Sequence, residues 1–241
     1  MGMNMIIYQI VNEYKRLDEV VSITLAGSGA SGRKDNYSDI DIDIITKKDI
    51  PVEKRKEIIS KLADDMEINN TLWGTSDEFV LRNSSVQVDI AYFDFEWLKE
   101  ELKNIVDRHN ASTGYTTCFW HNVVNSIIIY DTNNTFKEFQ EHYKVPYPLE
   151  LKKSIIAKNY PILRDSYSAY YNQIDKAIKR DDTISINHRI AGYLASYFDI
   201  IFAVNEILHP GEKRLLSISN KICTKKPKNF EENLKSSLMM K

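Results

Sequence analysis

The chain has 241 residues, of which 43% are hydrophobic and 11% aromatic, and its formal net charge is −2 at neutral pH. This length and composition are typical of a globular protein with one large core or two small ones. The near-neutral charge, without a long basic stripe, argues against a nucleic-acid-binding protein.

The charge is divided unevenly along the chain. Residues 1–145 carry 16 Lys and Arg against 24 Asp and Glu, whereas residues 146–241 carry 16 against 10. The two parts therefore have formal charges of −8 and +6. This asymmetry is typical of two parts that bind differently charged partners. A chance distribution of charge on the solvated surface explains it equally well.

The cysteines and the hydropathy exclude several protein classes. Cys118 and Cys223 have no CxxC spacing and no neighbouring His pair, which suggests neither a disulfide framework nor a zinc site. No run approaches the roughly 20 apolar residues that cross a bilayer, and the N-terminus lacks a basic leader. We therefore expect a cytoplasmic protein whose partners include neither a membrane nor nucleic acid.

Hydrophobic periodicity predicts strands and helices before residue 146 and helices alone after it. In chain order, the patterns predict a helix over 3–20, strands over 20–26 and 39–45, a helix over 52–66, hairpin strands over 78–82 and 86–92, a helix over 94–108, a short buried strand over 126–130 and a helix over 135–143. Pro146 and Pro148 mark a break. Beyond it, helices are expected over 149–179, 184–208, 212–222 and 228–239.

The most chemically specific stretch is Leu25–Thr46, where a glycine-rich turn follows one strand and precedes another. In the second strand, Asp39, Asp41 and Asp43 alternate with isoleucines. Because successive side chains of a strand point to opposite faces, the three carboxylates lie on one face and the isoleucines on the other. The same alternation places Asp89 on the polar face of the strand over 86–92.

The spacing excludes three known loop motifs. A dinucleotide-binding GxGxxG turn requires a crossover helix before the next strand, and only six residues separate Gly32 from Asp39. A P-loop requires Lys and then Ser or Thr after the second glycine, where this chain has Arg33 and Lys34. The glycine and glutamate of a calcium-binding EF-hand are isoleucines here. An acidic edge strand without chemistry remains open, although same-face carboxylates repel one another without a cation.

The remaining pattern is a hydrophobic strand, Gly27-Ser28, ten residues and Asp39-Ile40-Asp41. Here the sequence resembles the nucleotidyltransferase superfamily that includes DNA polymerase beta and the antibiotic adenylyltransferases. The family's third carboxylate lies on a later strand, and Asp89 matches that position. The resemblance covers about residues 1–145 and implies an α+β catalytic domain with a mixed sheet and flanking helices. The all-α helical bundle expected over 146–241 resembles the acceptor-binding part of aminoglycoside and lincosamide adenylyltransferases.

The resemblance also implies a reaction and its site. Two Mg²⁺ ions would be held by Asp39, Asp41 and Asp89, and a nucleoside monophosphate, expected to be AMP from ATP, would pass to a hydroxyl of a small molecule such as an aminoglycoside-type antibiotic. The nucleotide is expected at Gly27, Ser28, Arg33, Lys34 and Ser38.

Two positions depart from the family pattern. Many relatives carry an arginine where this chain has Ser31, so Arg33 is expected to take its place. Asp43 is surplus to the pattern and is assigned a supporting role.

The helical part offers weaker candidates. His188, Gly192, Ala195, Asp199 and Glu206 fall on one side of the helix expected over 184–208. Asp199 and Glu206 are candidate acceptor-binding residues, although a solvated helix face explains the pattern equally well. Two other functions remain open: adenylylation of a protein, as in antitoxin-like nucleotidyltransferases, and nucleotide binding without turnover.

Overall fold

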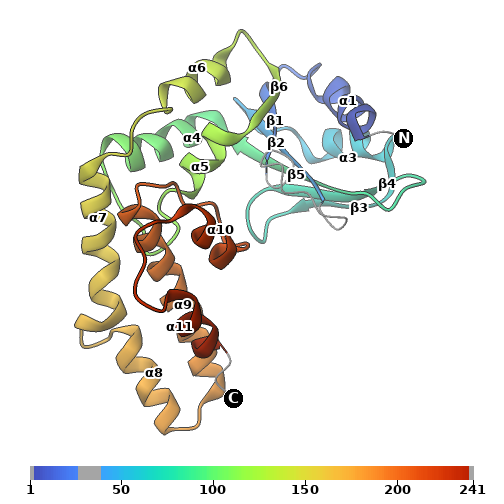
Figure 1. The fold of residues 1–241 in the computed structure, drawn as a ribbon. Coiled ribbons are helices and arrows are strands. Elements are labelled where there is room, and N and C mark those ends of the chain that lie inside the picture. The colour runs from blue at the N-terminus through green and yellow to red at the C-terminus, as the bar shows by residue number, and fades with distance from the viewer. Residues whose placement is uncertain (1–2, 27–38, 239–241) are drawn as a thin grey trace. The chain divides into compact units, whose positions relative to one another are not determined.

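The computed structural model describes residues 3–26 and 39–238, and Figure 1 shows its elements along the chain. The chain divides into two compact units. The first consists of Met1–Leu102 and Asn122–Lys144, and the second of Lys103–His121 and Val145–Lys241.

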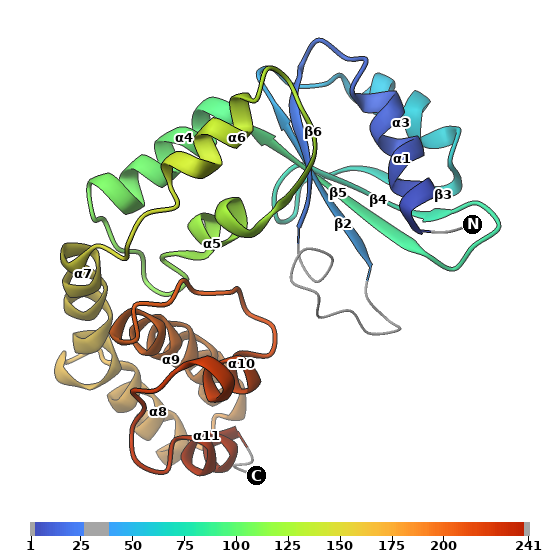
Figure 2. The same ribbon diagram turned by 45° about the horizontal axis from the view of Figure 1, so that its top comes forward.

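Six strands of the described residues form one mixed sheet in the first unit (Figure 2). They are β1 Val20–Leu25, β2 Ile40–Thr46, β3 Ala63–Asn70, β4 Ser76–Leu81, β5 Gln87–Asp94 and β6 Ile127–Asp131. Their order is β3-β4-β5-β2-β1-β6. Strands β2 and β5 run parallel, and the other neighbours run antiparallel. This sheet confirms the expected α+β class.

Helices cover one face of the sheet. Helix α1 (Met3–Tyr14) and helix α3 (Val52–Ser60) lie on this face (Figure 2) and bury Ile10 and Ile59 against the strands. Ile40, Ile42 and Ile44 of β2 belong to the same core, as the alternation predicted. The acids between them consequently face the opposite side of the sheet. Further α-helices among the described residues before residue 145 are α4 (Phe95–Leu102), α5 (Cys118–Asn125) and α6 (Thr135–His142).

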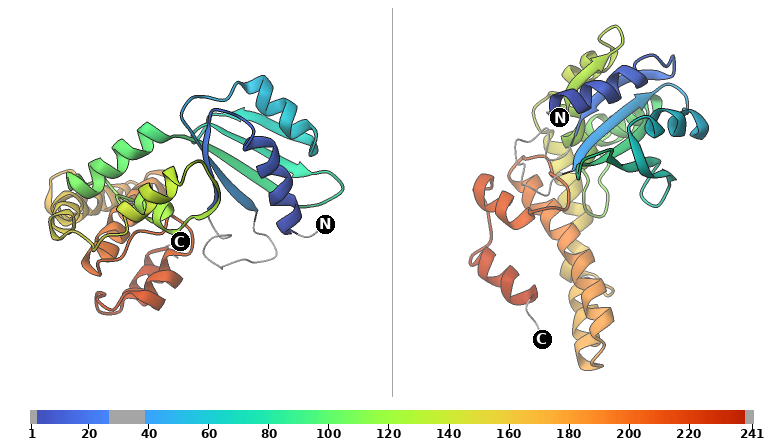
Figure 3. Two further views of the ribbon diagram at one scale, coloured as in Figure 1. Left: turned by 90° about the horizontal axis from the view of Figure 1, so that it is seen from above. Right: turned by 90° about the vertical axis from the view of Figure 1, so that its right-hand side faces the viewer.

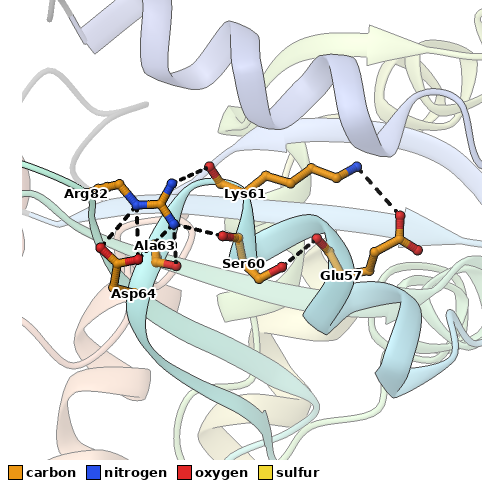
Figure 4. A network of polar contacts seen from close by, with 6 residues as sticks. All are labelled: Glu57, Ser60, Lys61, Ala63, Asp64 and Arg82. Carbon is orange, nitrogen blue, oxygen red and sulfur yellow. Dashed lines mark hydrogen bonds and ion pairs between the residues drawn. The ribbon is translucent and has the colours of Figure 1, made fainter.

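Strand β3 corrects the expected helix over 52–66, because α3 ends at Ser60. Figure 4 shows the contacts at this point: the Arg82 guanidinium donates to the carbonyl oxygens of Ser60, Lys61 and Ala63 and to the Asp64 carboxylate. The side chain therefore binds the carbonyl end of α3, where helical hydrogen bonds run out. As an edge strand with few apolar residues, β3 carries little strand signal in its sequence.

Other boundaries also differ from the expectation. The strand expected to be buried over 126–130 is the edge strand β6, with Ile127 44% exposed and Ile129 38% exposed. Helix α4 stops at Leu102 and is followed by a π-helical turn, Lys103–Asp107. Helix α5 was not expected at all. A period of 3.6 residues identifies helical segments well but does not locate their ends.

All elements described in residues 145–238 are helical, which confirms the expected helical C-terminal part. They are α7 (Leu149–Tyr160), a π-helical turn (Pro161–Asp165), α8 (Tyr170–Lys179), α9 (Thr183–Val204), α10 (Leu215–Ile222) and α11 (Phe230–Leu238). The helix expected over 149–179 is thus two helices, and α8 and α9 run side by side (Figure 3). None of the described helices is long and apolar enough to span a membrane.

The second unit includes a segment from the middle of the chain, residues 103–121. The Gly114 amide donates to Asn159 Oδ1 of α7 at 3.0 Å, and the Thr116 amide donates to Asp199 Oδ1 of α9 at 3.0 Å. Sequence analysis had placed this segment with the N-terminal part. The functional division into a catalytic domain over 1–145 and an acceptor-binding domain over 146–241 remains a prediction.

Candidate active site

Asp41 and Asp89 lie side by side on the face of the sheet opposite α1 and α3. Strands β2 and β5 are parallel neighbours, and Asp41 is the direct register partner of Asp89. Residues paired in this way point to the same face of a sheet. Asp39, half-buried, lies just before β2 and two residues from Asp41. The fold therefore brings together carboxylates that are 48 residues apart in the sequence.

Two further acids extend this pair across the sheet. Glu78 of β4 is the register partner of Asp89, and Glu67 of β3 is the register partner of Glu78. We call Asp41, Asp89, Glu78 and Glu67 the carboxylate row. Sequence analysis missed Glu78: pairing the predicted strands 78–82 and 86–92 from their turn places Phe79 opposite Asp89, and the observed register differs by one residue.

The local electrostatics follow from this crowding of like charges. Burial is the largest cause of the raised pKa of Glu78. Three neighbouring carboxylates raise this pKa further, and Asp89 has the strongest effect of the three. Burial and the nearby Asp41 raise the pKa of Asp43 to about 7. Carboxylates placed directly opposite each other destabilise a sheet unless a cation lies between them. This face of the sheet therefore favours the binding of cations.

Two side-chain amides hold acids of the row. Gln87 Nε2 donates to Asp89 Oδ1 at 3.1 Å, and Asn70 Nδ2 donates to Glu78 Oε1 at 3.4 Å. Each amide orients one carboxylate without neutralising its charge. The acids are thus fixed in direction while their negative charge is kept.

The donor set suits Mg²⁺, which prefers oxygen ligands and is usually bound by one or two carboxylates together with substrate phosphates and water. Within the described residues, no three His, Cys, Asp or Glu side chains are arranged to enclose a metal ion. Asp41 and Asp89 are two neighbouring carboxylates, the number that Mg²⁺ commonly takes from a protein when substrate phosphates and water supply its other ligands.

The other predicted residues divide into two groups. Gly27, Ser28, Arg33, Lys34 and Ser38 all lie outside the described residues. The two candidate acceptor-binding acids, Asp199 and Glu206, lie in different environments: Asp199 is 1% exposed, and Glu206 is exposed and pairs with Lys152 Nζ at 2.9 Å.

Asp199 has internal partners. The Thr116 hydroxyl donates to Asp199 Oδ2 at 2.6 Å, in addition to the Thr116 amide. A Cβ atom on Gly114 would meet Ala195 Cβ at 2.9 Å, and one on Gly192 would meet the Tyr170 hydroxyl at 2.7 Å. The small and polar face of α9 thus packs against residues 114–116 and α8. Asp199 is thus buried and hydrogen-bonded to Thr116 and Asn159, and its role in acceptor binding remains a prediction.

Comparison with known proteins agrees with this geometry. Residues 7–110 match the sequence model of the nucleotidyltransferase domain, a span that includes Asp39, Asp41, Asp89 and Glu78. No curated protein matches the chain in sequence.

Several solved structures are distantly similar. A nucleotidyltransferase-like protein from Exiguobacterium sibiricum is 12% identical over 91% of this chain, with a TM-score of 0.44, and the chain spans 62% of that protein. A toxin-antitoxin structure with AMP-PNP is 19% identical over 68% of this chain and 98% of that one, with a TM-score of 0.33. A spectinomycin adenyltransferase from Enterococcus faecialis, with ATP and spectinomycin, is 13% identical over 96% of both chains, with a TM-score of 0.30.

The family match covers the strands that bear Asp41, Asp89 and Glu78. Residues 7–110 therefore correspond to a nucleotidyltransferase domain, the domain of a family of transferase enzymes.

Proposed function

We propose that the chain transfers a nucleoside monophosphate, AMP from ATP, to a hydroxyl group of a small molecule and releases pyrophosphate. The observation that carries this proposal is the register pairing of Asp41 with Asp89, with Asp39 two residues before Asp41, in a domain of this family. Each of these acids is part of the pattern that the sequence resemblance identified.

In this proposal, Asp39, Asp41 and Asp89 hold magnesium. Magnesium bound there would offset charge on the triphosphate and make the attacking oxygen more nucleophilic. The acceptor oxygen forms a bond to the α-phosphorus, the bond from that phosphorus to the pyrophosphate oxygen breaks, and the hydroxyl proton passes to solvent. Gln87 keeps the Asp89 carboxylate directed during the reaction by its 3.1 Å hydrogen bond.

The charge of the site favours one kind of acceptor. The row continues through Glu78 to Glu67, two acids more than the metal-binding pattern requires. The N-terminal part as a whole has a formal charge of −8. A negative surface attracts cations and repels anions, so we propose that the acceptor is cationic, with an aminoglycoside-type antibiotic as the first candidate.

The test measures pyrophosphate release from Mg-ATP with a panel of aminoglycosides and lincosamides. We expect Asp39→Asn, Asp41→Asn and Asp89→Asn each to lower turnover at least 100-fold, because each removes a negative metal ligand. Asp65→Asn, which neutralises an exposed acid on β3, is the matched control and is expected to keep near wild-type turnover.

Three outcomes would contradict the proposal. Turnover that survives Asp41→Asn would exclude the catalytic assignment. Binding of Mg-ATP without turnover of any acceptor would favour a regulatory nucleotide-binding protein. A mass increase of one AMP on a co-purified protein, and on none of the small molecules, would replace the small-molecule acceptor with a protein.

A further inference from the structure

Two tryptophans and a leucine of the first unit are exposed near one end of the sheet. Trp73 is 99% exposed, Leu72 79% and Trp97 45%. Single exposed apolar residues are ordinary, but a group of them on one surface commonly marks a binding site.

The fold brings these residues together from two parts of the sequence. Leu72 and Trp73 lie in the loop between β3 and β4, and the first turn of α4 carries Trp97. The register pair Ser76–Ala91 and the hydrogen bond from the Tyr92 amide to the Thr75 carbonyl, 3.0 Å, place this loop beside the end of β5. The patch therefore spans the end of β5 and the adjacent hairpin loop.

Several contacts fix this surface. The Phe93 and Trp97 rings are stacked, with centroids 6.2 Å apart and planes 18° apart. Asp94 Oδ1 accepts a hydrogen bond from the Trp97 amide at 2.7 Å, and Asn70 Oδ1 accepts one from the Leu72 amide at 2.9 Å. We call Leu72, Trp73, Phe93 and Trp97 the aromatic patch. A surface ordered in this way loses little further entropy when a ligand binds.

The aromatic patch continues the face that bears the carboxylate row. Asp89, Ala91 and Phe93 alternate along β5, so they point to the same face. At about 3.3 Å per residue, Phe93 lies roughly 13 Å from Asp89. Ala91 of β5 lies between them on this face, with its register partners Ser76 on β4 and Asp43 on β2. Asp89 and Phe93 of the aromatic patch therefore lie on one face of the sheet.

From this continuity we infer that the aromatic patch binds an apolar or aromatic part of the acceptor while the reacting hydroxyl lies at Asp41 and Asp89. The inference rests on the proposed function and adds a substrate class to it. The acceptor is an extended small molecule whose apolar part lies roughly 10–13 Å from the hydroxyl, a distance that a single sugar ring does not span.

The first experiment titrates the full chain with N-phenyl-1-naphthylamine, a neutral aromatic dye that fluoresces when bound to apolar surface. We expect Trp73→Ala and Trp97→Ala each to weaken dye binding about 10-fold, the size of effect that removal of an aromatic contact produces. Trp97→Phe keeps a ring for stacking and is expected to restore most of the binding. Tyr167→Ala removes a fully exposed aromatic ring of the second unit and serves as the control.

The second experiment separates this inference from the proposed function. With lincomycin, which carries an apolar group, and kanamycin, which does not, we expect Trp97→Ala to raise the KM of lincomycin about 10-fold. The KM of ATP and the kcat are expected to stay near wild-type values. If Asp41→Asn abolishes turnover while the tryptophan variants change neither dye binding nor acceptor KM, the inference fails and the proposed function stands.

Three other results would overturn the inference. Displacement of the dye by Mg-ATP alone would assign the aromatic patch to the nucleotide. Self-association of the wild-type chain that Trp73→Ala abolishes, measured by sedimentation, would assign the patch to an interface between copies. Equal dye binding by the wild type and both alanine variants would show that the patch binds no aromatic group.

Discussion

At the scale of single residues, the carboxylate row places acid opposite acid on three pairs of neighbouring strands. The pairs are Asp41–Asp89, Asp89–Glu78 and Glu78–Glu67. Like charges in such positions cost stability in a sheet. A protein keeps an arrangement of this kind where the charges are needed for binding, and the cost is offset when a cation is bound.

The loss of stability that the charged Glu78 causes depends on pH, because its pKa differs between the folded and the unfolded chain. Because burial and its acidic neighbours raise this pKa, the folded chain holds the proton more tightly than the unfolded chain does. The charged form therefore lowers the free energy of unfolding. That penalty is absent below the ordinary glutamate pKa and complete above the raised value.

We predict that Glu78→Gln raises the free energy of unfolding by about 0.5 kcal/mol at pH 8 and gives no gain near pH 4. Urea denaturation at both pH values, with EDTA present to remove metal ions, measures the difference. Asp65→Asn, on the exposed edge strand, is expected to give less than half of the gain at pH 8. An equal gain at both pH values would show that charge is not the cause.

At the scale of elements, the side chain of Arg82 binds the segment where α3 ends and β3 begins. The Arg82 guanidinium contacts three carbonyl oxygens and the Asp64 carboxylate, and the Arg82 amide donates to the Leu62 carbonyl at 2.9 Å (Figure 4). The side chain therefore connects the turn between β4 and β5 to the chain between α3 and β3. Its position helps to hold the end of β4 beside the start of β3.

We predict that Arg82→Ala lowers the free energy of unfolding, because it removes hydrogen bonds to three carbonyl oxygens and an ion pair that solvent partly screens. Arg82→Lys is expected to recover less than half of this loss, because an ammonium group cannot reproduce the planar set of donors. Thermal and urea denaturation measure both effects. Lys54→Ala removes an exposed ion pair within α3 and is expected to change stability by less than 0.5 kcal/mol. A loss equal to that of Lys54→Ala would contradict this role for Arg82.

At the scale of the whole molecule, the chain forms two compact units. The second unit includes residues 103–121, which lie in the sequence between two segments of the first unit. Residues 103–121 leave the sheet unit after α4, and the chain returns to that unit at Asn122. Gly114 and Thr116 of this segment are held by Asn159 and Asp199. The division into units therefore does not follow a single cut in the sequence.

The buried Asp199 carries much of this attachment. Burial raises the pKa of its carboxyl group to about 6, while the hydrogen bonds from Thr116 favour the charged form. Removing the carboxylate leaves the Thr116 donors without their acceptor, which costs more than the hydrogen bonds themselves contribute.

We predict that Asp199→Ala lowers the free energy of unfolding by about 3 kcal/mol and accelerates hydrogen exchange of the Thr116 amide. Asp199→Asn keeps an acceptor oxygen and is expected to cost less. The control is Glu206→Ala, which removes an exposed ion pair and is expected to leave both measurements nearly unchanged. A raised acceptor KM in Asp199→Ala, with stability and exchange unchanged, would contradict this structural role and support the predicted role of Asp199 in acceptor binding.

Local sequence patterns are enough to predict the α+β fold class and the central acids of the candidate site. The alternation of Ile40, Asp41 and Ile42 fixes which side chains are buried and which face of β2 is acidic, because a strand has a side-chain period of two. The spacing from Gly27 to Asp39 distinguishes a nucleotidyltransferase pattern from other phosphate-binding loops. Both are local properties, readable over a few residues.

Contacts between residues that are distant in the sequence could be identified only in the tertiary structure. The parallel pairing of β2 with β5 places Asp41 beside Asp89, and β4 adds Glu78. Periodicity could not show that Asp199 is buried, because a small and polar helix face has the same sequence pattern whether it meets solvent or a buried loop. Residues 103–121 make that face internal through contacts such as Thr116 with Asp199, 83 positions apart. Contacts over such distances depend on the packing of whole elements, which no local pattern encodes.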